Sequence, residues 1–274
     1  MDLGFIKKEY NHHGKKLRYF GLPGESLYDI EAWAEFIGEI YAAEIGSKSD
    51  PSSKQSLLIA NAINMNVYDK LVLLRGEINE IILKGYDEIG TKIIYPFELI
   101  NLDYGGSLLY KDRIRVKSLD VLFKNQQKKD FLLLITSNVR EFDLEELIKT
   151  QDRIKKEFSQ FGKKFINQLN LYFNQINKDE SLLRQIIHVH YLIKNLAENN
   201  KFDIACYPGI KYEGSKQTIL IHYIFRLRYN MQASTKTPSK QTLVEILNQG
   251  VQEVSNGKLV DMIKYPDIIV NNEL

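Results

Sequence analysis

The segment Leu99–Gly106 holds residue types that could carry out chemistry on a bound molecule. An apolar run leads to Asn101, then to Asp103 and Tyr104, and two glycines follow. A carboxylate or an amide at the end of a buried strand can orient an amine or a hydroxyl for in-line group transfer. The tyrosine could stack on a base or on a cofactor ring. The alternative interpretation is a plain strand end, in which the Asp103 carboxylate binds amide groups of its own turn.

Three further residues could hold a cofactor. Gly21 and Gly24 lie between a predicted strand and a predicted helix, where glycine lets the backbone approach a ligand and a helix N-terminus favours negative charge. Glu77 follows the apolar run Lys70–Leu74 and could accept hydrogen bonds from ribose hydroxyls. The plainer interpretations are a tight turn for the glycines and a helix cap for Glu77.

These residues need alternating strands and helices to bring them together. Strands are predicted at 16–20, 70–74, 92–103 and 131–135, and helices at 27–41, 54–67, 78–85 and 116–125. This alternation predicts an α/β fold with a Rossmann-like, mostly parallel sheet, helices on both faces and right-handed crossovers. Because ligands bind at the carboxyl ends of parallel strands, we expect the candidate residues to meet at one edge.

The chain changes character after residue 143. The spacing of apolar residues predicts helices over about 143–200, and strands at 203–207 and 218–229 predict a C-terminal antiparallel hairpin. A short helix is predicted over 241–254. We therefore predict a single Rossmann-like domain over 1–274, with a helical insertion at about 143–200 and a short C-terminal helical tail at 241–274.

The order of these elements resembles the fold of class I S-adenosylmethionine-dependent methyltransferases. Three segments carry the resemblance. Phe20–Gly24 follows the first predicted strand, and Glu77 follows the second. The segment Asn101–Gly106 is similar to the Asp/Asn-Pro-aromatic segment that follows the fourth strand in nucleic-acid methyltransferases.

The resemblance implies a methyltransferase-like protein that acts on nucleic acid or is associated with it. It implies S-adenosylmethionine as the cofactor, held by Gly21, Gly24 and Glu77. It implies catalytic roles for Asp103, Asn101 and Tyr104. The usual first-strand pattern has an acidic residue and three spaced glycines, whereas this chain has two glycines and no acid before them. The reduced motif favours the alternative, a catalytically inactive Rossmann-like module that binds protein or nucleic acid in a phage-defence or mobile-element system.

Composition sets further bounds on the partners. The 37 basic and 35 acidic residues give a net charge of +2, which neither requires nor excludes a nucleic-acid partner. Basic and aromatic residues occur together over 207–229, where they could bind single-stranded nucleic acid, although packing of an edge hairpin is the favoured interpretation. The helices at 143–200 are a candidate surface for a protein partner.

No metal site and no membrane partner are expected. His188 and His190 lie two apart on a predicted helix and so point to different faces, and His12-His13 is interpreted as part of a solvated tail. Cys206 is the only cysteine, which fits packing in a reducing, cytoplasmic setting. The chain has no apolar run of about 18 residues, as a membrane span requires. The abundance of Asn, Lys, Ile and Tyr suggests a bacterial or phage origin.

Overall fold

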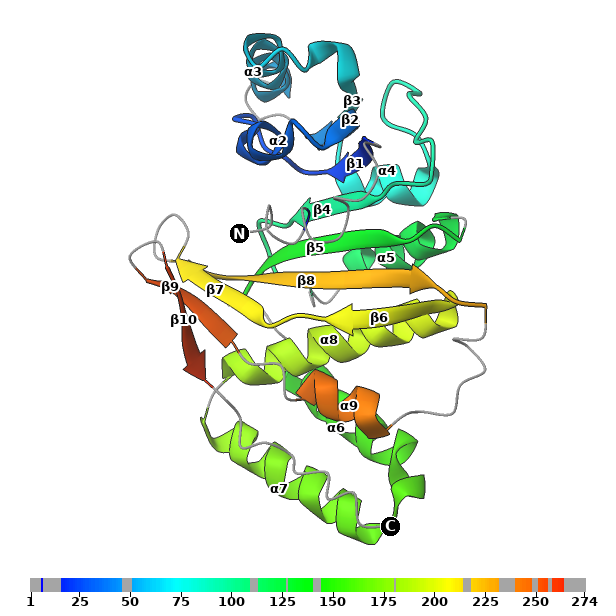
Figure 1. Cartoon of the computed structure of the whole chain (residues 1–274), viewed down its shortest axis with the longest axis vertical. Helices are drawn as coiled ribbons and strands as arrows, with labels where there is room; N and C mark the ends of the chain where they lie inside the picture. Colours follow the sequence, from blue (N-terminus) through cyan, green and yellow to red (C-terminus); the bar gives the residue numbers. More distant parts are fainter. Residues whose placement is uncertain are drawn as a thin grey trace. The chain divides into compact units, whose positions relative to one another are not determined.

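The computed structural model describes most of the chain (Figure 1). The described residues are 6, 16–45, 51–108, 113–126, 128–139, 144–179, 181–213, 218–231, 240–247, 251–255 and 258–263. They cluster into two compact units, of which the first comprises 1–103 and 117–134 and the second 104–116 and 135–274. Each unit is described by itself. The prediction of a single domain stays a prediction, and His12-His13 lies outside the described residues.

The first unit is a parallel sheet with helices. In chain order its elements are β1 (Leu17–Gly21), α2 (Tyr28–Trp33), β2 (Ile37–Glu44), α3 (Pro51–Asn64), the 3-10 turn η1 (Tyr68–Lys70), β3 (Leu71–Arg75), α4 (Ile78–Lys84), β4 (Leu99–Asp103), most of α5 (Ile114–Asn125) and the first half of β5 (Phe131–Asn138). The strand order is β5-β4-β1-β2-β3, and β1 pairs in parallel with both β2 and β4. This is the Rossmann order, so the predicted Rossmann-like α/β fold is confirmed.

Both faces of this sheet are covered, as the predicted helix layers require. Tyr19 and Phe20 are neighbours on β1 and so point to opposite faces, yet both are fully buried. Tyr19 packs against Trp33 of α2, and Phe20 stacks on Phe97. The strand β5 is buried on both faces and reads as a continuous apolar run, which is why it could be predicted from its sequence.

The predicted helix at 27–41 is confirmed at its start and wrong after Trp33. The helix α2 ends at Trp33, and the second strand β2 begins at Ile37 and pairs in parallel with β1. The spacing of Ile37, Ile40 and Tyr41 fits a helix, but it fits equally well a strand whose two faces are both buried. Pairing with β1 decides in favour of the strand. The run at 70–74 is consequently the third strand and not the second.

The predicted strand at 92–103 is wrong in its first half, because β4 begins only at Leu99. Pro96 has no N–H group to donate to a neighbouring strand. The carbonyl oxygens of Ile94 and Pro96 instead accept hydrogen bonds from the Arg18 guanidinium, at 2.8 and 2.7 Å.

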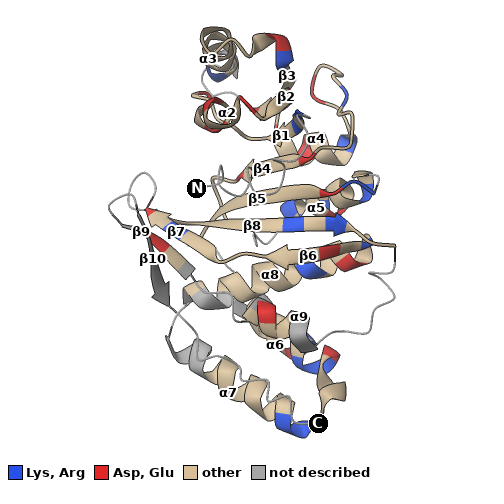
Figure 2. Ribbon diagram, in the orientation of Figure 1, with Lys and Arg blue, Asp and Glu red and all other residues tan. Residues whose placement is uncertain are grey.

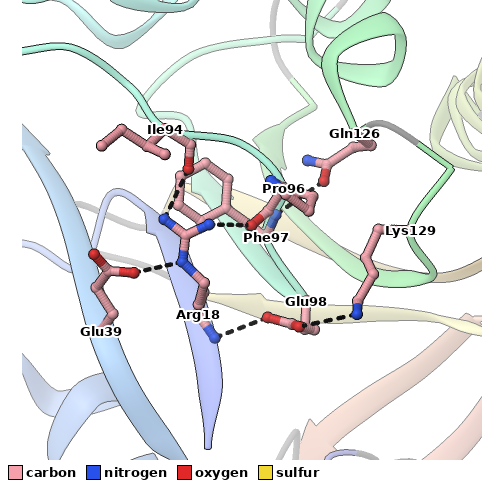
Figure 3. Close-up of polar contacts among 8 residues, drawn as sticks. All are labelled: Arg18, Glu39, Ile94, Pro96, Phe97, Glu98, Gln126 and Lys129. Carbon is pink, nitrogen blue, oxygen red and sulfur yellow. Dashed lines mark hydrogen bonds and ion pairs between the residues drawn. The ribbon is translucent and has the colours of Figure 1, made fainter.

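Arg18 is the centre of a charged network at the amino end of β1 (Figure 3). Its guanidinium also pairs with Glu39 and lies over the ring of Phe97, 5.0 Å from the ring centre. Its backbone N–H donates to Glu98, whose carboxylate lies 3.7 Å from the Lys129 ammonium. These contacts tie segments of the sheet to one another, so the network is structural.

The second unit joins helices to antiparallel strands. It contains the second half of β5, α6 (Leu144–Glu157), the 3-10 turn η2 (Ser159–Phe161), α7 (Lys163–Asp179), α8 (Ser181–Asn199), β6 (Phe202–Cys206), β7 (Gly209–Glu213), β8 (Ile219–Tyr229), α9 (Lys240–Leu247), β9 (Val251–Ser255) and β10 (Lys258–Ile263). The strand order is β10-β9-β7-β8-β5, and β8 pairs antiparallel with both β6 and β7. The predicted helices at 143–200 and the C-terminal antiparallel strands are confirmed.

The predicted helical tail at 241–274 is confirmed over 241–247 and wrong over 251–255 and 258–263, which are strands. The helix α9 ends at Leu247, and β9 and β10 follow as an antiparallel pair, with β9 also parallel to β7. Residues 251–255 show only part of the alternation of apolar and polar side chains that is typical of a strand. Pairing with β7 nevertheless gives their backbone groups the hydrogen bonds that a helix would otherwise provide. Residues 264–274 lie outside the described residues. No helix in the described ranges is long and apolar enough to cross a membrane.

Both histidines of α8 are buried, and this predicts acid sensitivity. Burial lowers the pKa of His188 to about 4, and the charges of Arg153 and Arg113 lower it further. Burial also lowers the pKa of His190 to about 4, although the carbonyl oxygens of Ile186 and Tyr207, one beside each ring nitrogen, oppose the shift. Both rings are therefore neutral in the folded protein at pH 7.

We expect the free energy of unfolding to fall as the pH drops from about 6.5 to about 4, because the unfolded chain binds these protons first. The stabilising effect is complete above about pH 6.5, the ordinary histidine value. Urea unfolding at about pH 7.5 and about pH 5 measures it. The variant His188→Gln should show a smaller difference between the two pH values, and an unchanged difference would contradict the assignment.

Candidate functional site

The strand order places a switch point between β1 and β4. From β1 the chain order continues outward through β2 and β3 on one side and through β4 and β5 on the other. In open α/β sheets, ligands bind outside the carboxyl ends of the strands at such a point. Gly21 is the last residue of β1 and lies opposite Asn101 of β4. The structure therefore brings two of the predicted site segments together.

Gly21 is required by the close approach of β1 to β4. The carbonyl of Asn101 accepts a hydrogen bond from the Leu22 N–H at 2.9 Å. A Cβ atom on Gly21 would overlap that carbonyl oxygen and lie 3.0 Å from the Tyr19 hydroxyl. Gly24 differs, because it has a φ of +68° and a Cβ atom added there would meet nothing within 4 Å. Gly24 thus provides both the turn and an open backbone approach.

A buried polar cluster lies beside Gly21. The side-chain amide of Asn101 donates from Nδ2 to the Asp29 carboxylate at 2.7 Å. Asn101 is 3% exposed and Tyr19 is fully buried. The Asn101 Oδ1 atom and the Tyr19 hydroxyl are both buried and make no hydrogen bond of good geometry, although Asn101 lies close enough to Tyr19 to favour its charged form. Buried polar atoms without partners are rare in native proteins and need an explanation.

The cluster is acidic. Burial raises the pKa of the Tyr19 hydroxyl well above its usual value, and the negative charges of Asp29 and Asp103 raise it further. The side chain of Asn101 has the opposite, smaller effect and lowers this pKa. Tyr19 therefore keeps its proton. The helix α2, which supplies Asp29, carries acidic residues and no lysine or arginine (Figure 2). Among the described residues no group of three or more His, Cys, Asp or Glu side chains could hold a metal ion. Asp29 and Asp103 therefore give this cluster a negative charge.

Asp103 ends β4 with an exposed side chain. Its carboxylate is close enough to Tyr19 to influence the phenol electrostatically. The residue thus belongs to the same edge of the sheet as Gly21 and Asn101, as the sequence predicts.

Glu77 is a helix cap. It is the N-cap residue of α4, and its carboxylate accepts hydrogen bonds from the Glu80 N–H at 3.0 Å and from the Asn79 side chain at 2.6 Å. This is the plainer of the two interpretations of Glu77 from the sequence. Glu77 also follows the third strand, whereas the ribose-binding acid of Rossmann folds follows the second.

We expect Glu77→Ala to lower the free energy of unfolding by about 1 kcal/mol, because an N-cap is lost. Chemical denaturation measures the loss. Glu80→Ala is the matched control, since its exposed pair with Lys84 contributes less than about 0.5 kcal/mol. Equal losses in the two variants would contradict the capping role of Glu77.

The acid that ends the second strand is Glu44, which the sequence analysis missed. Glu44 is 8% exposed and lies on β2, whose residue Ala42 is opposite Gly21. Its backbone carbonyl accepts hydrogen bonds from the Gly76 N–H and from the Gln55 side chain. The signal that could have identified it is an acid at the end of an apolar run, about 20 residues after the glycine-rich turn.

Tyr104 belongs to the second unit and is buried there. Its ring is 2% exposed, and the Arg115 guanidinium lies over it, 4.8 Å from the ring centre. Arg115 is itself held by the carbonyl of Ser107. The Tyr104 N–H donates to the Thr136 carbonyl. Stacking of Tyr104 on a base or a cofactor stays a prediction, and it requires Arg115 to leave the ring.

The residues predicted as a possible contact for single-stranded nucleic acid lie on two different faces of β8. Tyr223 and Phe225 are fully buried and contact the ring of His190 on α8, so they pack as the favoured interpretation predicts. Arg226 and Arg228 point to the other face of β8. In the sheet they pair with Ala205 and Asp203 of the neighbouring strand β6. Burial lowers the pKa of Arg226, and the neighbouring charge of Arg228 lowers it further.

No family model matches the chain, and no curated protein matches it. Among solved structures, the chain is similar to an O-methyltransferase from Bacillus cereus in complex with SAH, with a TM-score of 0.46 and 11% identity over 83% of this chain and 80% of that one. A putative RNA methyltransferase from Pyrococcus horikoshii gives a TM-score of 0.45 and 11% identity over 84% and 81%. A precorrin-6y C5,15-methyltransferase from Geobacter metallireducens gives 0.39 and 9% over 80% and 82%.

Proposed function

We propose that the first unit binds S-adenosylmethionine at the carboxyl ends of β1, β2 and β4, and that the chain is a methyltransferase-like protein. One observation supports this most strongly. At the switch point of a Rossmann-ordered sheet, two buried oxygen atoms that make no hydrogen bond of good geometry lie beside the carboxylates of Asp29 and Asp103. S-adenosylmethionine carries a sulfonium and an ammonium group, so an acidic edge with spare hydrogen-bonding atoms suits it.

The residues fit the cofactor in three places. The open backbone at Gly24 allows close approach, and Gly21 keeps β1 and β4 in contact. Glu44 is the candidate for the ribose hydroxyls in place of Glu77. Asp29 supplies a carboxylate that β1 lacks, since Tyr19 stands before the glycines. When bound, S-adenosylmethionine supplies a transferable methyl group, and Asn101 and Asp103 are proposed to orient the acceptor.

Calorimetry with S-adenosylhomocysteine tests the proposal. We expect the wild-type protein to bind it, and Glu44→Gln to weaken binding about tenfold, because a charged acceptor is lost. The matched control is Glu80→Gln, an exposed acid on α4 that should bind as the wild type does. The absence of binding to the wild-type protein at about 1 mM nucleoside would overturn the proposal.

We propose nucleic acid as the acceptor or partner. Arg226 and Arg228 project from the same face of β8 and are close enough to interact, which gives a positive patch that attracts phosphates, although Asp203 of β6 lies opposite Arg228. Fluorescence anisotropy with single-stranded RNA at about 50 and about 200 mM salt tests this. We expect salt-sensitive binding that Arg226→Ala/Arg228→Ala weakens and Lys149→Ala does not. Equal affinity in both variants would contradict the patch.

The second candidate function is a catalytically inactive module. The burial of Tyr104 under Arg115 favours it, because this aromatic ring is then closed to a base. This candidate predicts RNA or protein binding without any affinity for S-adenosylhomocysteine. The calorimetric experiment therefore distinguishes the two.

A further inference from the structure

We propose that single-stranded nucleic acid lies along one face of β6 and β8, with a base stacked on the ring of Tyr207 and phosphates held by Arg226 and Arg228. The inference rests on the proposed nucleic-acid partner and names its form, which is a single strand and not a duplex. It assigns a role to Tyr207, the residue that directly follows β6.

The first step is that the two faces of β8 differ in their exposure. Tyr223 and Phe225 are fully buried and contact His190 of α8. Arg226 and Arg228, the basic residues of β8, point to the opposite face because side chains alternate along a strand (Figure 2). The residue of β6 that pairs with Arg226 is an alanine, and it is exposed. A helix packed at this place would bury so small a side chain, so this part of the face is open to solvent.

The second step places Tyr207 on the same open face. Its N–H donates to the Ile224 carbonyl at 3.1 Å, so the pairing of β6 with β8 continues to this residue. Tyr207 therefore points to the same side as Ala205, two residues earlier. Burial raises the pKa of Tyr207 and the charge of Arg228 lowers it in part, so the phenol and the guanidinium are near each other. Tyr207 is only partly buried, which leaves part of it accessible.

The third step is what these side chains can bind together. The two arginines are about 7 Å apart along β8, a span similar to that between neighbouring phosphates of an extended single strand. A tyrosine ring can stack on any base, but only an unpaired base exposes its flat side to a protein. Asp203 pairs with Arg228 in the sheet and accepts a hydrogen bond from Asn230 at 2.5 Å, so it weakens the positive charge of the two arginines without cancelling it.

Fluorescence anisotropy with three RNA probes tests the inference. The probes are a single strand of about eight nucleotides, a backbone of the same length without bases, and a hairpin duplex. At about 50 mM salt we expect the wild-type protein to bind the single strand about tenfold more tightly than the backbone without bases, because one base stacks on Tyr207. Tyr207→Ala should reduce this ratio to about one and leave the affinities for the other two probes unchanged.

Matched variants separate stacking from packing and from charge. Tyr207→Phe keeps an aromatic ring and should retain the preference, whereas Tyr207→Leu keeps only the apolar bulk and should lose it. Tyr68→Ala removes an exposed tyrosine of η1 and should bind all three probes as the wild type does. Arg226→Ala/Arg228→Ala should weaken the binding of all three probes and reduce its salt dependence, because phosphate contacts need no base.

Each remaining outcome decides a different point. Equal affinity of the wild-type protein for the single strand and the backbone without bases would overturn the inference, as would a preference retained in Tyr207→Ala or an equal loss of duplex binding in that variant. Polyglutamate that displaces the single strand as well as unlabelled RNA does would indicate an acidic protein as the partner and also overturn it.

Failure of the proposed function gives a different result. If the wild-type protein binds none of the RNA probes, the proposed nucleic-acid partner fails and this inference fails with it. If the protein shows no affinity for S-adenosylhomocysteine but binds the single strand through Tyr207, the cofactor proposal fails and this inference is supported.

Discussion

Gly21→Ala should destabilise the protein by about 3 kcal/mol and abolish nucleoside binding. The added Cβ atom would overlap the Asn101 carbonyl oxygen, which is backbone and belongs to the neighbouring strand. A strand pair cannot yield as a flexible side chain can, so β1 and β4 must move apart. That movement also displaces Asn101. Chemical denaturation measures the stability, and calorimetry with S-adenosylhomocysteine measures the binding.

Gly24→Ala is the matched control for this prediction. Its φ of +68° makes alanine unfavourable by about 1 kcal/mol, but no atom lies within 4 Å of the new methyl group. We therefore expect a smaller loss of stability than for Gly21→Ala. Equal effects of the two variants would show that turn flexibility, and not the contact with β4, explains both glycines.

Lys194→Ala should destabilise the second unit by about 3 kcal/mol, because it leaves two carboxylates without their cation. The Lys194 side chain is fully buried between α8 and α6. Its ammonium lies 3.1 Å from Glu157 and 2.8 Å from Glu198. Tyr191 donates a further hydrogen bond to Glu157. Urea unfolding of the variant measures the loss.

Two comparisons make the prediction specific. Lys194→Met keeps the packing of the side chain and removes only its charge. Glu157 and Glu198 are 24% and 38% exposed, so water can solvate part of the carboxylate charge that loses its cation. We expect a smaller loss for this variant. Lys149→Ala removes an exposed pair with Glu145 on α6 and should change stability by less than about 0.5 kcal/mol. A similar loss in Lys149→Ala and Lys194→Ala would contradict the role of burial.

The fold could be predicted from sequence where a strand is one continuous apolar run. Leu71–Leu74 and Phe131–Ile135 are such runs, and no helical spacing competes with them. The strand β2 was missed because Ile37, Ile40 and Tyr41 also fit a helical repeat. That single error moved the expected ribose-binding acid from Glu44 to Glu77.

The candidate site could be predicted only where chemistry lies next to a strand end. Asn101 and Asp103 follow an apolar run, so their place at the sheet edge could be inferred. The contact of Asp29 with Asn101 could not, because it depends on how α2 packs and has no local signal. The structural reason for Gly21 could not be predicted either, because a close contact between two strands produces no recognisable pattern in a single sequence.

The central claim is that the carboxyl ends of β1, β2 and β4 bind S-adenosylmethionine. Titration of ¹⁵N-labelled protein with S-adenosylhomocysteine, followed by NMR, tests it most directly. The account predicts shifts of the backbone amides of Gly21, Gly24 and Glu44 and of the Asn101 side-chain amide, while the amide of Arg18 at the amino end stays in place. Shifts confined to the amino end of the sheet, or no shifts at all, would contradict it.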